Sequence, residues 1–145
     1  MRQHGVILAL CLSLLGCGSI GYRVVSTDHA VRLGASVALS PISHAGGTGD
    51  PEGFDASLAR ALEDTTPDHR VEADARYTIH VDVRELRREG ERTIASSAVS
   101  IRDGRGQTVD ELDVSFEVRA DEAEAGAELG RRIGHFVTHR EDHRI

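Results

Sequence analysis

Large aromatic side chains and cysteine are scarce in this chain. Its 145 residues contain no tryptophan, two tyrosines, three phenylalanines and two cysteines. Both cysteines, Cys11 and Cys17, lie near the amino terminus, so the rest of the sequence has no thiol for a disulfide, a thiolate metal site or a cysteine nucleophile. Because aromatic residues are so few, the core has to be built from valine, leucine, isoleucine and alanine.

Lysine is also missing, and the charge balance is acidic. All 17 basic residues are arginine, against 24 aspartate and glutamate residues, which gives a formal net charge of −7. An acidic chain without a basic stripe argues against nucleic-acid binding. The sequence also lacks a Gly-x-Ser-x-Gly elbow, a Walker loop and a His-Glu-x-x-His motif. We therefore predict no catalytic residue and no cofactor, and we expect that the protein is not an enzyme.

The amino-terminal segment has the layout of a secretory signal. Arg2 precedes an apolar run at residues 6–15, which is too short to span a bilayer because a membrane helix needs about 20 apolar residues. Residues 14–17, Leu-Leu-Gly-Cys, resemble the bacterial lipobox, whose cysteine is acylated and becomes the first residue after cleavage. We predict a lipoprotein signal peptide at residues 1–16 and lipid attachment at Cys17. Gly18 replaces the aspartate associated with inner-membrane retention, which by the same resemblance implies the cell outer membrane, with the protein facing the periplasm.

Hydrophobic periodicity predicts six elements in the mature chain. They are a strand at 31–39 ended by Pro41, a helix that begins after Asp50 and stops before Pro67, strands at 77–85, 93–103 and 112–118, and a helix at about 121–140. The crossover helix makes its two flanking strands parallel, and two glycine-containing turns make the last three strands an antiparallel meander. We predict an α+β two-layer sandwich of order β-α-β-β-β-α, with a mixed four-stranded sheet and both helices on one face.

These elements form one domain with short extensions at both ends. We predict a single α+β domain at residues 31–140, a lipidated tether at 17–30 that includes a candidate short strand at 22–25, and a tail at 141–145. Gly126, Gly130 and Gly134 recur every four residues in the last helix. Glycine lowers helix propensity, so we expect these three positions to let the sheet approach the helix closely.

Three histidines at the carboxyl-terminal end of the sequence have the spacing of a metal-binding helix face. His135, His139 and His143 follow an i, i+4, i+8 pattern that could present imidazoles to zinc. They lie away from the apolar stripe and have no matched carboxylate of the Glu-x-x-His type. We therefore predict a solvated helix face and no metal site.

The polar sides of the strands collect charged residues. His80 and Asp82 share one strand face, and Glu111, Asp113 and Glu117 share another. A catalytic carboxylate pair is one interpretation, and cross-strand partners for Arg84 or Arg102 on an exposed sheet are the favoured one.

Arginines gather at the first turn of the meander. Arg87, Arg88 and Arg92 converge on Gly90, with Arg84 close by. Guanidinium groups at a loop tip suit phosphate recognition, whereas the interleaved glutamates are typical of a solubilising turn. We keep Arg84, Arg87, Arg88 and Arg92 as candidate ligand or partner contacts.

Several short segments together resemble the LPS-assembly lipoprotein LptE family. They are the lipobox followed by Gly21-Tyr22, then VALSPI, LARALED, VEADARYTIHVDV, IRDGRGQTV and the amphipathic terminal helix. The similarity covers nearly the whole mature chain and implies the same two-layer sandwich. It also implies a plug inside the LptD β-barrel that assists barrel assembly and lipopolysaccharide insertion into the outer leaflet. The four arginines above would then contact lipopolysaccharide.

Two other interpretations stay open. A lipobox and a β-α-β-β-β-α domain also occur in other periplasmic lipoproteins, such as activators of penicillin-binding proteins and secretion-associated lipoproteins. That alternative is an interaction module of another system. A histidine-dependent metal hydrolase is the third interpretation. For a plug, the expected partner surface is the polar sheet face together with the turn at residues 87–92.

Overall fold

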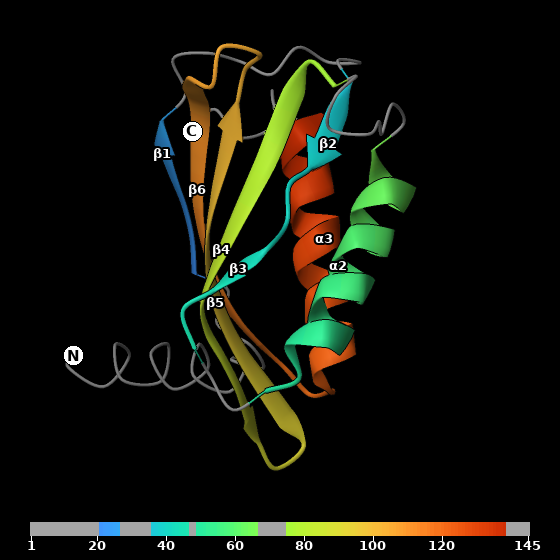
Figure 1. Ribbon diagram of the computed structural model, residues 1–145. Helices are drawn as coiled ribbons and strands as arrows, with labels where there is room; N and C mark the ends of the chain where they lie inside the picture. Colours follow the sequence, from blue (N-terminus) through green and yellow to red (C-terminus); the bar gives the residue numbers. More distant parts are fainter. Residues whose placement is uncertain (1–20, 27–35, 47–48, 67–74, 139–145) are drawn as a thin grey trace, which may run out of the picture.

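The computed structural model describes residues 21–26, 36–46, 49–66 and 75–138. The elements are β1 (Gly21–Ser26), β2 (Val37–Leu39), β3 (Ser43–His44), α2 (Pro51–Thr65), β4 (Tyr77–Glu89), β5 (Arg92–Arg102), β6 (Thr108–Val118) and α3 (Glu122–Thr138). The strands form one mixed sheet in the order β1-β6-β5-β4-β2, and β3 also pairs with β4. Both helices pack against the same face of this sheet (Figure 1), which confirms the predicted α+β sandwich.

The sheet has two more strands than the four expected. β1 extends the sheet beside β6 and lies within residues 17–30, the segment predicted as a tether. The two-residue β3 follows Pro41 on the same edge as β2. The connectivity is as predicted, since β2 runs parallel to β4, and β4, β5 and β6 pair antiparallel in sequence. The signal peptide, Cys17, His139, His143 and the tail at 141–145 lie outside the described residues.

Helix α2 begins and ends at the residues that the sequence indicates. The Asp50 carboxylate caps the helix by accepting a hydrogen bond from the Gly53 amide at 3.2 Å, and Pro51 occupies the first turn. At the other end the Thr66 hydroxyl donates to the Leu62 carbonyl at 2.6 Å. The predicted apolar stripe is confirmed, because Phe54, Leu58, Ala61 and Leu62 are all buried.

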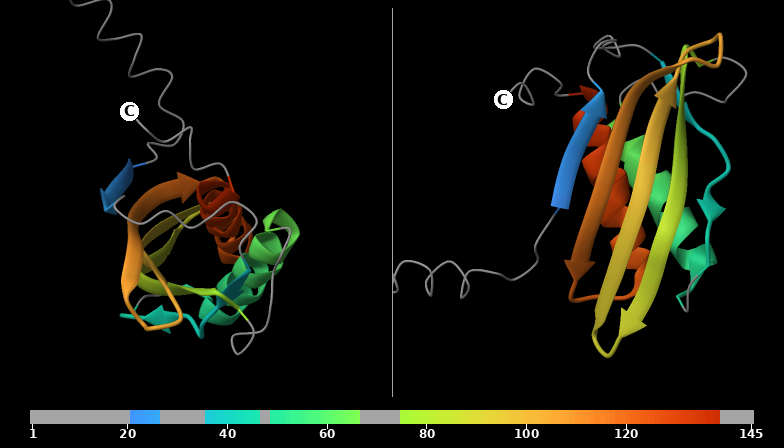
Figure 2. Two further views of the ribbon diagram at one scale, coloured as in Figure 1. Left: turned by 90° about the horizontal axis from the view of Figure 1, so that it is seen from above. Right: turned by 90° about the vertical axis from the view of Figure 1, so that its left-hand side faces the viewer.

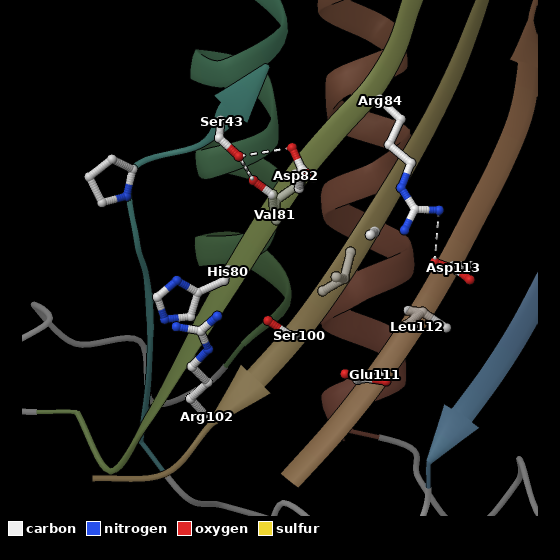
Figure 3. A pocket seen from close by; sticks show the side chains of 13 residues that line it. Ser43, His80, Val81, Asp82, Arg84, Ser100, Arg102, Glu111, Leu112 and Asp113 are labelled. Atoms are coloured by element: carbon white, nitrogen blue, oxygen red, sulfur yellow. Dashed lines mark hydrogen bonds and ion pairs between the residues drawn. The ribbon is translucent and has the colours of Figure 1, made fainter. Parts of the chain in front are cut away.

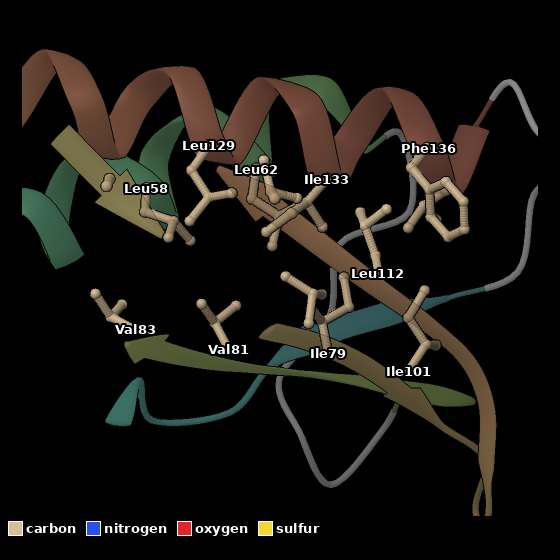
Figure 4. Packing of buried hydrophobic residues seen from close by; sticks show 14 of the residues in the cluster. Leu58, Leu62, Ile79, Val81, Val83, Ile101, Leu112, Leu129, Ile133 and Phe136 are labelled. Carbon is tan, nitrogen blue, oxygen red and sulfur yellow. The ribbon is translucent and has the colours of Figure 1, made fainter. Parts of the chain in front are cut away.

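The core lies between the inner sheet face and the two helices. Aliphatic side chains from β4, β5 and β6 meet leucine and isoleucine side chains of the helices (Figure 4). The largest fully buried side chains are Phe54, Leu58, Leu62, Ile79, Leu86, Ile101, Leu112, Leu129 and Ile133. As predicted, valine, leucine, isoleucine and alanine supply most of this core. None of the described helices is long and apolar enough to cross a membrane.

The three glycines of α3 face the neighbouring helix and not the sheet, so that expectation was wrong. A Cβ at Gly126 would overlap the carbonyl oxygen of Phe54, and a Cβ at Gly130 would lie 2.5 Å from the carbonyl oxygen of Leu58. A Cβ at Gly134 would overlap the Thr65 hydroxyl. The missing side chains therefore let the α3 backbone approach the α2 backbone at Gly126 and Gly130, and the Thr65 side chain at Gly134. The stripe of glycines indicates close approach, but the sequence does not say of which element.

Candidate functional site

The outer sheet face carries the predicted polar side chains and is not covered by a described helix (Figure 2). Cross-strand pairing of β4, β5 and β6 aligns their outward residues into rows. Two central rows are His80–Ser100–Glu111 and Asp82–Ala98–Asp113. In each row the middle strand contributes a small side chain and the outer strands contribute charged or ionisable ones. The next row towards the β4–β5 hairpin is Glu85–Ser96–Ser115.

This arrangement leaves a concavity along β5, which we call the polar trough (Figure 3). Its volume is about 460 Å³. It is lined by Pro41, Ser43, His80, Val81, Asp82, Arg84, Ala98, Val99, Ser100, Arg102, Glu111, Leu112 and Asp113. The trough exists because Ala98 and Ser100 form a low floor between the longer side chains of β4 and β6. The charged walls were predicted from the sequence, and this floor was not. The signal was the run of small residues in TIASSAVSI, whose outward members after Ile94 are Ser96, Ala98 and Ser100.

One ion pair crosses the polar trough. Arg84 on β4 reaches Asp113 on β6 with an Nη1–Oδ1 distance of 3.5 Å, over the strand that carries Ala98 (Figure 3). The two side chains remain 57% and 42% exposed, so a partner can compete for either charge. Arg84 sits at a bulge between Val83 and Glu85. This pair confirms the expected cross-strand partnership of Arg84.

Asp82 and Arg102 also line the trough. The Ser43 hydroxyl donates to Asp82 at 3.0 Å, which ties the β3 edge to the wall of the trough. Arg102, also considered as a partner for the carboxylates, makes no ion pair within the described part of the chain. It lines the same end of the trough as His80, since Arg102 is paired with Thr78, two residues before His80 on β4 (Figure 3). The described residues contain no group of three side chains placed to hold a metal ion.

The hairpin arginines are each paired with a carboxylate. Arg87 contacts Glu85 at 3.0 Å and also Glu89, and Arg92 contacts Glu117 at 2.6 Å. Arg88 lies 3.5 Å from Glu122 at the start of α3. With Arg84 on Asp113, all four candidate lipopolysaccharide contacts have an acidic neighbour within the chain. The structure brings three of them to the hairpin and places Arg84 at the trough.

The exposed face of α3 carries a separate charge cluster. Arg131 donates to Glu124 at 2.9 Å and to Glu128 at 3.0 Å, while Arg132 donates to Glu128 at 2.8 Å. Burial raises the pKa of the Glu128 carboxyl, but the hydrogen bonds from Arg132 and Arg131 outweigh burial and leave that pKa below its usual value. His135 is exposed beside this cluster, as predicted for the histidine series.

Comparison with known proteins identifies the fold. No protein-family model matches the sequence, and no curated protein matches it. Among solved structures, the chain is similar to the PelC dodecamer from Paraburkholderia phytofirmans, with a TM-score of 0.57, 16% identity, and coverage of 83% of this chain and 96% of that chain. A second crystal form of that dodecamer, of a variant with one leucine changed to methionine, gives a TM-score of 0.57, 17% identity, and coverage of 83% and 95%. At this identity the likeness concerns the fold alone.

Proposed function

We propose that this protein is an outer-membrane lipoprotein whose domain is a self-associating interaction module. The observation that carries the proposal is the polar trough: a charged, preorganised hollow on a sheet face that no described helix covers. A complementary polar surface can satisfy these groups, and a partner that brings opposite charges to Arg84, Arg102 and Glu111 would be selected over one that does not.

Copies of the same chain are the partner we favour. PelC, which has the same fold over almost its whole length, is a dodecamer. If copies of this chain repeat one head-to-tail contact, two different surfaces on each copy have to fit one another. The trough is a strong candidate for one of them. The second surface would lie on another side of the same domain, so that the contact repeats from copy to copy.

The LptD-type barrel plug is the second candidate. It rests on the segments that resemble the LptE family and on the uncovered polar sheet face, because the lumen of such barrels is polar. In that case one copy would sit in one barrel, assist its assembly and help to insert lipopolysaccharide. The four arginines would have to exchange their internal carboxylate partners for lipid phosphates to bind lipopolysaccharide directly.

The experiment is a mild-detergent purification of the tagged full chain from outer membranes, followed by native mass measurement. Masses at multiples of the lipidated chain support self-association. Recovery of LptD with one copy of the chain supports the plug, and recovery of a peptidoglycan synthase supports an activator of that system. A monomer without a partner would overturn the proposal.

Membrane attachment is tested separately. Cys17→Ala should leave the precursor unlipidated and should move the protein out of the outer-membrane fraction. Mass analysis of the mature amino-terminal peptide reports the acyl chains directly. Unchanged fractionation together with an unmodified peptide would contradict the lipid anchor.

A further inference from the structure

The direction of β1 shows from which end the chain enters the sheet. β1 is antiparallel to β6, and Gly21 lies opposite Ser115, which in turn lies opposite Ser96 of β5. From Gly21, β1 runs away from the β4–β5 hairpin and towards the β5–β6 turn (Figures 1 and 2). The amino-terminal end of β1 therefore points to the end of the molecule from which the β4–β5 hairpin projects.

The register also sets two lengths that can be compared. Four residue steps separate Cys17 from Gly21, and four extended residues span at most about 14 Å. Glu91, in the hairpin turn, lies five residues beyond Ser96, which corresponds to about 17 Å of strand. Even a fully extended connection therefore leaves Cys17 no further out than the hairpin tip. Any bend in the connection shortens its reach and leaves the tip further ahead.

We infer that the β4–β5 hairpin tip, residues 88–92, rests among the phospholipid headgroups of the membrane that holds Cys17. The inference rests on the lipid anchor of the proposed function. Acyl chains on Cys17 bring its backbone to the headgroup layer, because the chains themselves occupy the hydrocarbon core. A hairpin that projects at least as far must enter the same layer when the strands stand upright on the membrane.

The chemistry of the tip fits headgroups and not acyl chains. Residues 87–92 are Arg-Arg-Glu-Gly-Glu-Arg, with no apolar side chain. Arg88, Glu89, Glu91 and Arg92 are exposed, and Arg88 also donates to the Gly90 carbonyl at 2.9 Å. Guanidinium and carboxylate groups present together match a zwitterionic headgroup, in which a phosphate accepts from arginine and an ammonium donates to glutamate. The tip would therefore bind phosphatidylethanolamine-type headgroups without needing a net positive charge.

The test uses a single thiol at each end of the sheet. The acylated mature chain has no free cysteine, so Glu91→Cys and Gly104→Cys each give one labelling position. Gly104 is a matched control, since it lies in the β5–β6 turn at the opposite end, is exposed, and has open space for a side chain. The full lipidated protein carrying a fluorophore is reconstituted into vesicles of phosphatidylethanolamine and phosphatidylglycerol. These vesicles are prepared with and without a headgroup-labelled quencher lipid.

Quencher lipid should remove most of the emission at position 91 and little of it at position 104. Equal quenching at both positions, or stronger quenching at 104, would overturn the inference and indicate a tilted or inverted domain. Co-flotation with the vesicles is measured in the same samples. A protein that floats without quenching at 91 contradicts the hairpin inference alone, whereas a protein that does not float contradicts the lipid anchor itself.

Discussion

Two stripes of small residues in this molecule differ in what occupies the space beside them. In α3, Gly126, Gly130 and Gly134 are covered by the backbone and side chains of α2. In β5, the outward residues Ala98 and Ser100 form the floor of an open trough. Both stripes make room, but the first space is filled by the protein itself and the second is left for another molecule. A small residue at a regular interval therefore indicates a close approach, and only the structure tells whether the approaching group belongs to the same chain.

The largest expected effect comes from filling the first stripe. Gly126→Ala places a methyl group onto the carbonyl oxygen of Phe54. This oxygen belongs to the backbone of α2, so it cannot rotate out of the way as the end of a side chain can. We expect a loss of about 2–3 kcal/mol in the free energy of unfolding, because overpacking outweighs the roughly 1 kcal/mol gain in helix propensity. Urea denaturation measures the loss. Gly104→Ala, in an open turn, is the control and should change stability little.

The same comparison ranks the three glycines. Gly130→Ala should lower the free energy of unfolding less than Gly126→Ala does. The added Cβ would lie 2.5 Å from the Leu58 carbonyl oxygen at position 130 and 2.1 Å from the Phe54 carbonyl oxygen at position 126. Gly134→Ala should cost about as much as Gly130→Ala, because rotation of Thr65 can move its hydroxyl but not its Cβ, which would lie 2.6 Å from the added methyl group. A reversed order would show that α2 and α3 adjust as rigid units.

Filling the second stripe should affect assembly and not folding. Ala98→Leu raises the floor of the trough beneath the Arg84–Asp113 pair. On an open surface we expect a stability change within about 0.5 kcal/mol. Self-association should weaken about tenfold, which corresponds to about 1.4 kcal/mol. Analytical ultracentrifugation of the detergent-solubilised protein measures it, and unchanged assembly would remove the trough from the interface.

Charge reversal in the trough should have a smaller effect. Arg84→Glu places two acids together and should weaken association more than Arg84→Ala does, because repulsion adds to the lost contact. The cost in unfolding free energy should stay below about 1 kcal/mol, as for other exposed pairs. The double variant Arg84→Asp, Asp113→Arg keeps the internal pair. Recovery of stability without recovery of association would show that the partner requires the positive charge at position 84 and the negative charge at position 113.

The smallest expected effect lies on the exposed face of α3. The lowered pKa of Glu128 means that its contribution to stability is present above its unfolded-state pKa and is lost as the pH falls through its folded-state pKa. Glu128→Gln should therefore lower stability near pH 7 by less than about 1 kcal/mol. The difference from the natural protein should shrink as the pH falls through the folded-state pKa of Glu128. Urea denaturation over a series of acidic pH values measures this, and a pH-independent difference would contradict the assignment.

The sequence was most informative where one residue type had one physical meaning. Asp50 and Pro51 predicted the start of α2, Gly90 and Gly106 predicted turns in which both adopt positive φ, and alternation predicted the inner and outer faces of β4 to β6. It was less informative where meaning depends on a distant neighbour. The Arg84–Asp113 pair was anticipated from shared faces, but the hollow beneath it depends on the register of three strands. β1 was weakly indicated because its pairing partner lies almost a full domain away in sequence.

That remote pairing has a consequence for the order of folding. The hairpins β4–β5 and β5–β6 join neighbours in the chain, whereas Gly21 pairs with Ser115. Closing a long loop costs more entropy than closing a hairpin, so the meander and its helices should form first and β1 should join last. The strand nearest the predicted acylation site would then be the final piece added to the sheet. The domain can therefore complete most of its folding before β1, next to the predicted acylation site, pairs with β6.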